Sequence, residues 1–106
     1  MKKILGLILF GLAGAALAQS PAGNADAGRG KTSACIGCHG IPGYKTVYPN
    51  VYQVPMITGQ QPAYMVKALQ AYKSGARSHP SMRAIAASLS EQDMADVAAY
   101  YAQAPK

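Results

Sequence analysis

The two cysteines of this 106-residue chain lie in the run Cys35-Ile36-Gly37-Cys38-His39. Two thiols three positions apart, followed at once by a histidine, predict the covalent attachment of a c-type haem. The thiols can add to the two haem vinyl groups as thioethers, and the imidazole of His39 can bind the iron from one side. This motif is the strongest indication of chemistry in the sequence.

Three other chemistries compete for these residues. A thioredoxin-like redox pair needs strands that alternate with helices, and the sequence around the motif lacks that alternation. A Cys2His2 zinc site could take His79 as its fourth ligand, but the gap from His39 to His79 lacks the usual short spacing. A disulfide between Cys35 and Cys38 would close a very short loop and stabilise the fold little. The haem interpretation is therefore favoured.

The N-terminus has the pattern of a secretory signal peptide, which we predict over residues 1–18. Lys2 and Lys3 precede an apolar run, Ile4 to Ala18, that ends in the small-residue sequence Ala-Leu-Ala. The run is shorter than the ~20 residues that a membrane-spanning helix needs, so we expect no membrane anchor after cleavage. Residues 19–106 would then form one small periplasmic domain, to whose core a haem would add apolar surface.

The charge is moderately basic. Ten Lys and Arg against 4 Asp and Glu give a formal net charge of +6, with two of the lysines in the predicted signal peptide. Such an excess of positive charge favours encounter with a redox protein partner that has an acidic face. No motif indicates binding to nucleic acid. A solvated surface that only keeps the protein soluble is the alternative. The candidates for a basic rim around the docking site are Lys45, Lys67, Lys73, Arg77 and Arg83.

Apolar periodicity and capping residues predict an all-α fold of three main helices and loops. The first helix begins near Asn24 or Asp26 and runs into the haem motif. The second begins at Pro62 and ends at Gly75. The third has Ser90 and Asp93 as a capping box and ends near Ala104-Pro105. The residues expected on the buried faces of the second and third helices are Met65, Ala68, Leu69, Tyr72, Met94, Val97, Ala98 and Tyr101.

The stretch between the haem motif and Pro62 is predicted to be a loop without strands. Pro42, Pro49 and Pro55 rule out a continuous helix there, although three tyrosines in it are spaced by four. Its many Tyr and Val side chains suggest that it covers the edge of a haem. Packing over the protein core is the alternative.

A second iron ligand would decide what the site does. A Met thioether gives a six-coordinate centre suited to electron transfer, whereas an open face gives a ligand-binding or catalytic haem. Met82 follows a proline-containing loop that could carry it round the haem, but it is also in helical register with Ile85 and Leu89. Met56 and His79 stay open as alternatives. Met65 and Met94 lie on apolar helix faces, which predicts core packing.

The chain resembles the class I c-type cytochromes, in particular the small soluble bacterial monohaem kind that is similar to one half of a dihaem cytochrome c. The resemblance extends over nearly the whole of residues 19–106. The matching positions are Gly28, the run Cys35 to Gly40, the run Pro55 to Gln60, Tyr64, Leu69, Tyr72, the run Gly75 to Arg77, Met82, Leu89, Ser90, Asp93 and the run Ala98 to Tyr101.

This resemblance implies the class I cytochrome c fold around one covalently bound haem c. Cys35 and Cys38 would make the thioethers, and His39 and Met82 would be the proximal and distal iron ligands. The carbonyl of Pro55 would accept a hydrogen bond from the other ring nitrogen of His39. Gly28 would lie where the first and last helices cross, against Tyr100, and Tyr101 would face the haem side.

The function we expect is therefore a periplasmic monohaem electron carrier rather than an enzyme, a monomer or a subunit of a redox complex. Two rivals stay open. The first is a dedicated electron-transfer subunit of a dehydrogenase or oxidase. The second is a ligand-binding sensor or an enzyme with an open distal haem face.

Overall fold

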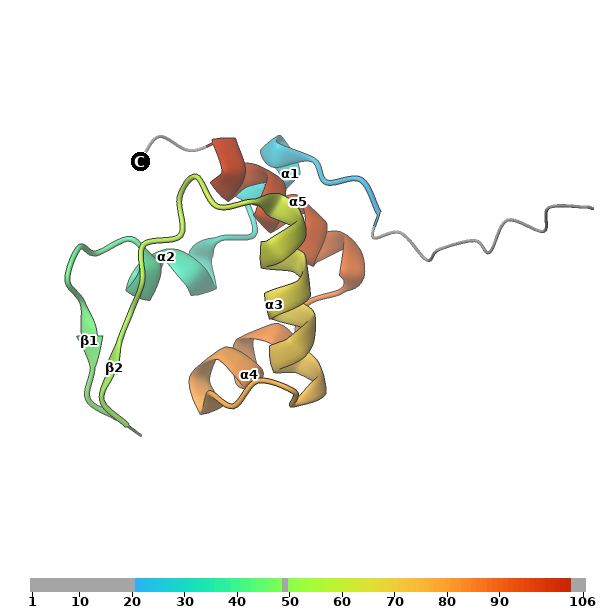
Figure 1. The fold of residues 1–106 in the computed structure, drawn as a ribbon. Helices are drawn as coiled ribbons and strands as arrows, with labels where there is room; N and C mark the ends of the chain where they lie inside the picture. The colour runs from blue at the N-terminus through green and yellow to red at the C-terminus, as the bar shows by residue number, and fades with distance from the viewer. Residues whose placement is uncertain (1–20, 49, 104–106) are drawn as a thin grey trace, which may run out of the picture.

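The computed structural model describes residues 21–48 and 50–103, so the predicted signal peptide, Pro49 and the last three residues lie outside the described part. Within it, five helices and one short β-hairpin follow one another (Figure 1). They are α1 (Ala25–Arg29), α2 (Ser33–His39), β1 (Lys45–Thr46), β2 (Tyr52–Gln53), α3 (Pro62–Ser74), α4 (Pro80–Ala87) and α5 (Glu91–Gln103). The all-α prediction is confirmed. None of the described helices is long and apolar enough to cross a membrane.

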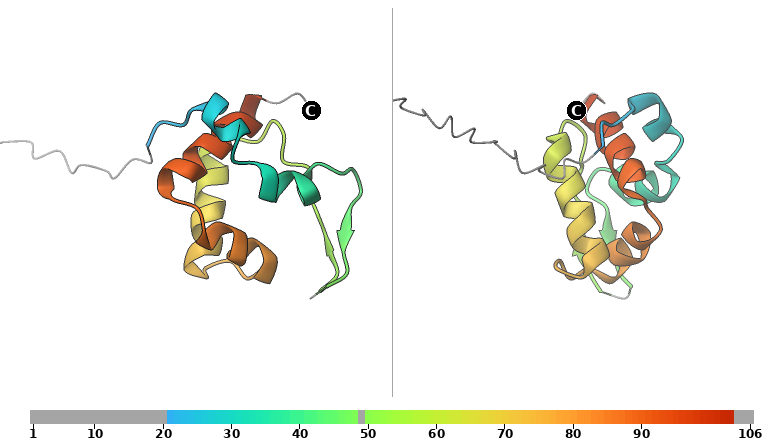
Figure 2. Two further views of the ribbon diagram at one scale, coloured as in Figure 1. Left: turned by 180° about the vertical axis from the view of Figure 1, so that it is seen from behind. Right: turned by 90° about the vertical axis from the view of Figure 1, so that its right-hand side faces the viewer.

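Helix α5 is the centre of the packing. It contacts α1 on one side and α3 on another, and α4 packs against α3 (Figure 2). The buried cluster between these helices consists of Met65, Val66, Leu69, Met94, Val97, Ala98 and Tyr101. Met65 and Met94 thus lie in the core, as the apolar periodicity predicts. The expected buried face of the last helix is confirmed in full.

The ends of α3 and α5 follow the predicted capping residues. Pro62 is the first residue of α3, and Gly75 ends it with φ of 86°, a left-handed conformation that glycine adopts without strain. At the start of α5, the Asp93 amide donates to Ser90 Oγ at 3.0 Å, and the Ser90 amide donates to Asp93 Oδ2 at 2.9 Å. This reciprocal pair is a capping box.

The first predicted helix is wrong in one respect, because the structure breaks it in two. Asn24 caps α1 as expected, with its Oδ1 accepting from the Ala27 amide at 3.0 Å. The helix then ends at Gly30, and α2 begins only at Ser33. Gly30 favours an end here since glycine loses much conformational freedom in a helix. The hydroxyl of buried Thr32 donates to the Arg29 carbonyl, which stabilises the turn between the two helices.

The prediction of a loop without strands is also wrong in part. Lys45 pairs with Gln53 and Thr46 with Tyr52 in an antiparallel hairpin, β1–β2. Side-chain bonds of Thr46 support it, because its Oγ1 donates to the Asn50 carbonyl and accepts from the Tyr52 amide. The hairpin projects to one side of the helices (Figure 1). Two-residue strands are too short to leave an alternating pattern in the sequence.

Helices α1 and α5 cross at Gly28, as the resemblance implies. A Cβ at Gly28 would overlap the Asp96 carbonyl and would lie 3.0 Å from the Cβ of Tyr100. Only a glycine therefore permits this close approach of the two backbones. The crossing holds the segment that leads into α2 against the core.

A polar cluster beside this crossing stabilises it further. Lys31 Nζ lies 2.6 Å from Asp96 Oδ2 and 2.9 Å from Asp93 Oδ1. The other oxygen of Asp96, Oδ1, accepts from the Asn24 amide at 2.9 Å and from the Gln92 side chain at 2.8 Å. Asp96 is only 2% exposed, so its charge needs these partners. The hydrogen bond from Lys31 lowers the pKa of Asp96 to about 2. The Ser90 amide does the same for Asp93.

We expect this cluster to make the fold sensitive to acid. The pKa values of Asp93 and Asp96 fall from an unfolded value of ~3.9 to about 2, so their contribution to stability is present above pH ~4. It is lost as the pH falls through about 2. Urea unfolding of Asp96→Asn should therefore show lower stability at pH 7 and a shallower loss between pH 4 and pH 2 than wild type. Asp26→Asn, which changes an exposed acid of α1, is the matched control. Parallel pH profiles for wild type and Asp96→Asn would contradict this role.

Candidate haem site

The two thiols lie on one helix at the spacing that the motif requires. Cys35 and Cys38 are free thiols on α2, three residues apart and so on the same side of the helix, and both are half-buried. Cys35 packs against the core cluster. Burial raises the pKa of its thiol, whereas a redox-active pair needs a lowered one. A raised thiol pKa is the opposite of what the thioredoxin-like alternative requires.

His39, the last residue of α2, is held by the loop that follows. Its Nδ1 lies 2.6 Å from the carbonyl oxygen of Pro55. Because a carbonyl only accepts, Nδ1 must carry the proton and donate it. The neutral ring then has its lone pair on Nε2, the nitrogen that is available to a metal. This is the contact that the resemblance implies, and it would fix the ring and raise its basicity.

Tyr101 supplies a test of whether a haem fits beside α2. Its side chain is 5% exposed, yet its hydroxyl has no hydrogen-bond partner in the described part of the chain. Burial raises the pKa of this phenol to about 12, with Cys35 as a further contributor. A buried hydroxyl without a partner is costly and rare. A bound group with polar substituents on this side would satisfy it, which a haem with its propionates could do.

The candidates for the distal ligand occupy different places. Met82 lies in the first turn of α4, half-buried, and packs against the core cluster. Met56 is 48% exposed and directly follows Pro55, which binds the Nδ1 end of His39. Met56 therefore follows the residue that contacts the Nδ1 end of His39, the end of the ring opposite to Nε2. His79 caps α4, and its Nδ1 accepts a hydrogen bond from the Met82 amide.

The zinc alternative finds no support in the described residues. Among them, no three His, Cys, Asp or Glu side chains are grouped closely enough to hold a metal ion. Cys35, Cys38 and His79 therefore do not assemble with His39 as a Cys2His2 site would require. The two thiols and His39 of α2 remain a candidate site for a covalently attached haem, in which only the histidine would bind the iron.

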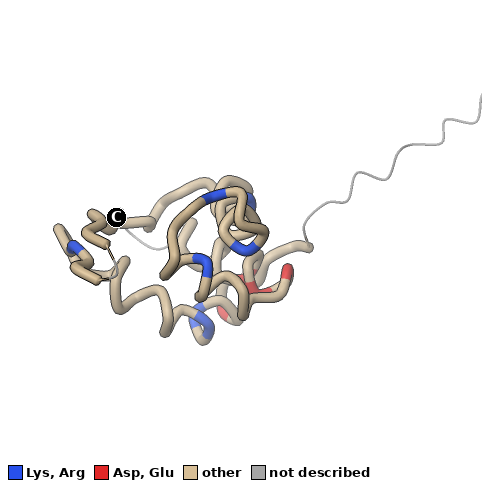
Figure 3. The backbone as a smooth tube through the Cα atoms, turned by 90° about the horizontal axis from the view of Figure 1, so that it is seen from below, with Lys and Arg blue, Asp and Glu red and all other residues tan. Residues whose placement is uncertain are grey.

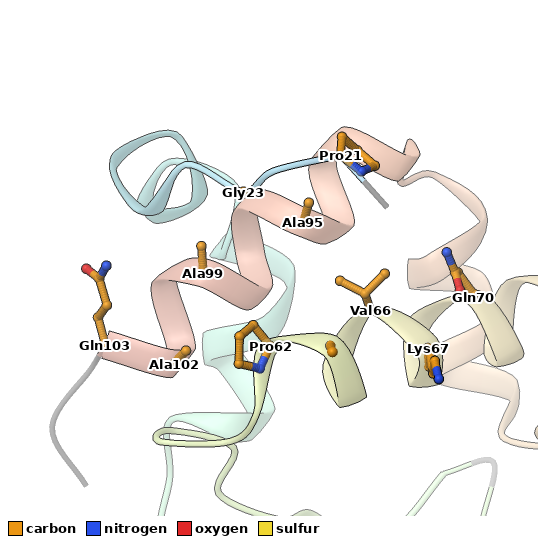
Figure 4. A pocket seen from close by; sticks show the side chains of 11 residues that line it. Pro21, Gly23, Pro62, Val66, Lys67, Gln70, Ala95, Ala99, Ala102 and Gln103 are labelled. Atoms are coloured by element: carbon orange, nitrogen blue, oxygen red, sulfur yellow. The ribbon is translucent and has the colours of Figure 1, made fainter. Parts of the chain in front are cut away.

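A groove of about 660 Å³ lies elsewhere, between α3, α5 and the segment before α1 (Figure 4). Small side chains of α5, those of Ala95, Ala99 and Ala102, line one side of it, and Pro62 and Val66 line the other. None of the residues of the haem motif borders this groove, and neither does Met82. It is therefore separate from the candidate haem site.

The predicted basic rim is spread over the hairpin, α3, the turn after α3 and α4, which carries Arg83. Lys45 lies on the hairpin and Lys67 on α3, both exposed. Lys73 Nζ donates to the Leu89 carbonyl, and the Arg77 guanidinium lies over the Tyr72 ring, 4.6 Å from its centroid. Seen from below, Lys and Arg are distributed widely, whereas Asp and Glu gather on one side (Figure 3). Within the described part of the chain, the acidic residues are therefore more localised than the basic ones.

This fold and this site define a class of protein, namely a small helical domain that binds haem c covalently. The comparisons with known proteins agree. Residues 25–104 match the family model described as cytochrome c. The chain belongs to the cytochrome c family, whose cofactor is haem c with its iron and whose partners are redox proteins.

Individual relatives are similar over much of this chain. Cytochrome c4 of Pseudomonas aeruginosa is 38% identical over 102 residues, which cover 96% of this chain and 48% of the relative. Cytochrome c4 of Stutzerimonas stutzeri is 36% identical over 110 residues, covering 95% and 50%. Cytochrome c-554(548) of Halomonas halodenitrificans is 39% identical over 85 residues, covering 76% and 95%. The chain spans about half the length of the cytochrome c4 relatives and nearly all of the cytochrome c-554(548).

Proposed function

We propose that this protein is a periplasmic monohaem cytochrome that carries single electrons between redox partners. The observation that carries the proposal is the arrangement on α2, where two thiols and His39 occupy one short helix. The Pro55 carbonyl accepts a hydrogen bond from Nδ1 of His39 and so orients its ring. A haem c bound there supplies an iron that changes by one electron between its ferric and ferrous states. The remaining chemistry consists of binding and positioning by the protein.

Each site residue has a distinct role in this proposal. Cys35 and Cys38 attach the porphyrin, which ties α2 to the core through a group with a large apolar surface. His39 is the proximal iron ligand, and the Pro55 carbonyl fixes its ring and its tautomer. Met82 is the distal ligand. It is favoured over Met56 because Met56 follows the residue that contacts the Nδ1 end of His39.

A methionine on the distal side suits electron transfer rather than catalysis. A thioether ligand raises the reduction potential and leaves no open position on the iron. We therefore expect a potentiometric titration to give a single one-electron transition, and the reduced protein to bind carbon monoxide poorly at neutral pH. Rapid and complete carbon monoxide binding by the reduced protein would instead support a sensor or an enzyme with an open face.

Location and partner follow from the sequence and from the charge. We propose that residues 1–18 direct export to the periplasm, that residues 19–106 form the mature cytochrome domain, and that the basic rim meets an acidic face on a redox protein. The members of this rim are Lys45, Lys67, Lys73, Arg77 and Arg83. The association rate with such a partner should fall as ionic strength rises, since salt screens exposed charges. A double variant, Lys45→Gln/Lys67→Gln, should weaken this salt dependence. A rate that does not change with salt would remove the electrostatic part of the proposal.

A second candidate is a dedicated electron acceptor for one dehydrogenase. A thiosulfate dehydrogenase electron acceptor of Stutzerimonas stutzeri is 39% identical over 66 residues, which cover 62% of this chain and 29% of the relative. Size-exclusion chromatography of the native periplasmic fraction separates the two candidates. A free carrier elutes at the size of a small monomer, and a permanent subunit elutes with its enzyme.

A further inference from the structure

We propose that His79 is a positioning residue for Met82. It caps the helix that carries Met82 and ties that helix to the β-hairpin through a ring stack. The inference rests on the proposed function, because it concerns how the distal ligand is held. In this inference His79 supports the distal ligand and does not itself bind the iron.

The first contact is the cap of α4. His79 has extended backbone angles, with φ of −164° and ψ of 105°, and its Nδ1 accepts from the Met82 amide at 3.2 Å. Its carbonyl accepts from the Arg83 amide at 2.8 Å, the first hydrogen bond of the helix. Amide groups in the first turn of a helix have no partner within the helix. The amide that His79 satisfies belongs to the proposed ligand itself.

The second contact is the ring stack between the hairpin and α4. The ring centroids of Tyr52 and His79 are 4.0 Å apart with an angle of 30° between the planes. Tyr72 of α3 meets the His79 ring edge-on, with an angle of 80° between the ring planes and 6.2 Å between the centroids. The His79 ring thus joins the hairpin, α3 and α4 at one point. The amide of Tyr52 is itself held by Thr46 of the opposite strand.

These two contacts act on a helix that is short. Helix α4 has 8 residues, and helices of this length are not stable on their own in water. Met82 lies in its first turn, where fraying would begin. A ligand must be held within about 0.5 Å of its productive position, so freedom at the start of α4 would weaken the bond from its sulfur. The cap and the stack restrict that freedom from two directions.

The experiment separates the cap from the stack with three variants of the holoprotein. His79→Asn keeps a side-chain acceptor for the Met82 amide but has no ring. His79→Phe keeps a ring for Tyr52 but has no acceptor, and His79→Ala has neither. Tyr48→Ala is the matched control, because Tyr48 is 86% exposed near the tip of the same hairpin. The readout is the affinity of the oxidised protein for added imidazole, which must displace Met82, together with the near-infrared band of sulfur-to-iron coordination.

We expect His79→Ala to bind imidazole more tightly by roughly 25-fold, since the loss of the cap and the loss of the aromatic contact each correspond to roughly fivefold in affinity. His79→Asn and His79→Phe should each show about half of this effect on a logarithmic scale, and Tyr48→Ala none. Thermal melting of each variant accompanies the titration. Variants that melt earlier but bind imidazole as wild type does would show a merely structural role and overturn the inference.

Failure of the inference differs from failure of the proposed function. If wild type shows the near-infrared band and His79→Ala, His79→Asn and His79→Phe all match its imidazole affinity, Met82 is a ligand that His79 does not position. If wild type lacks the band, and Met82→Ala binds imidazole as wild type does, the distal ligand is not Met82. A wild-type spectrum of two histidine ligands that His79→Asn abolishes would make His79 the ligand and overturn the inference.

Discussion

Replacing Met82 with alanine is expected to abolish the near-infrared band of the oxidised protein and to let the reduced protein bind carbon monoxide readily at neutral pH. The reason is that Met82 is the proposed distal ligand, and alanine leaves that iron position open. The midpoint potential should fall by at least about 60 mV, which corresponds to a tenfold loss in the preference for ferrous over ferric iron. Absorption spectra and a potentiometric titration measure all three effects.

Met56→Ala is the matched control for this prediction. Met56 is 48% exposed and follows the residue whose carbonyl contacts His39, so its loss should leave the band and the potential unchanged. The opposite pattern would be a band that survives in Met82→Ala and disappears in Met56→Ala. It would show that Met56, in the loop after the hairpin, is the distal ligand instead of Met82 on α4.

Replacing both thiols, as Cys35→Ser/Cys38→Ser, is expected to abolish covalent haem attachment and to destabilise the fold. Cys35 packs against the core cluster, and the Tyr101 hydroxyl beside it is buried without a partner in the described residues. Without a tethered haem, this side of the core loses its largest apolar contact. Far-UV circular dichroism should show less helix, and any pigment that is retained should pass into acidified acetone.

The single variants make this prediction sharper. Cys35→Ser and Cys38→Ser should each keep one thioether, so the pigment should stay with the protein in acidified acetone in both. The double variant differs from them only in the missing covalent bond. If the double variant is exported, folded and coloured with an unextractable pigment, the thiols do not attach the haem.

Much of the helical part of the fold could be predicted because the residues at the helix ends act locally. Pro62, Gly75 and the Ser90–Asp93 capping box depend on the backbone within one turn, and each has the predicted place in the structure. The buried face of α5 was predictable for a similar reason. Its apolar residues repeat at the helical period, and the core covers them.

The features that the sequence did not predict depend on contacts between distant residues. The break after α1 accompanies the ion pairs of Lys31 with Asp93 and Asp96, 65 positions further along the chain in the case of Asp96. The hairpin depends on side-chain bonds of Thr46 and on the stack of Tyr52 with His79. No periodicity reveals such partners in advance.

The site shows the same division. The thiols and His39 are predicted as the haem site from five adjacent residues. The contact of His39 with Pro55, which the structure contains, is implied by the resemblance. The cap that His79 forms on the Met82 amide was missed, because histidine is an uncommon capping residue and its ring suggested metal binding instead. The proline after it could have indicated the cap, since proline is favoured as the first residue of a helix.

The most direct test is mass spectrometry of the protein exported by a bacterium that attaches c-type haem. Denatured protein in acid should have the mass of the polypeptide without residues 1–18 plus one haem, and peptide fragments should locate the added mass on Cys35 and Cys38. A bare polypeptide from the same cells, with both thiols free, would contradict the account.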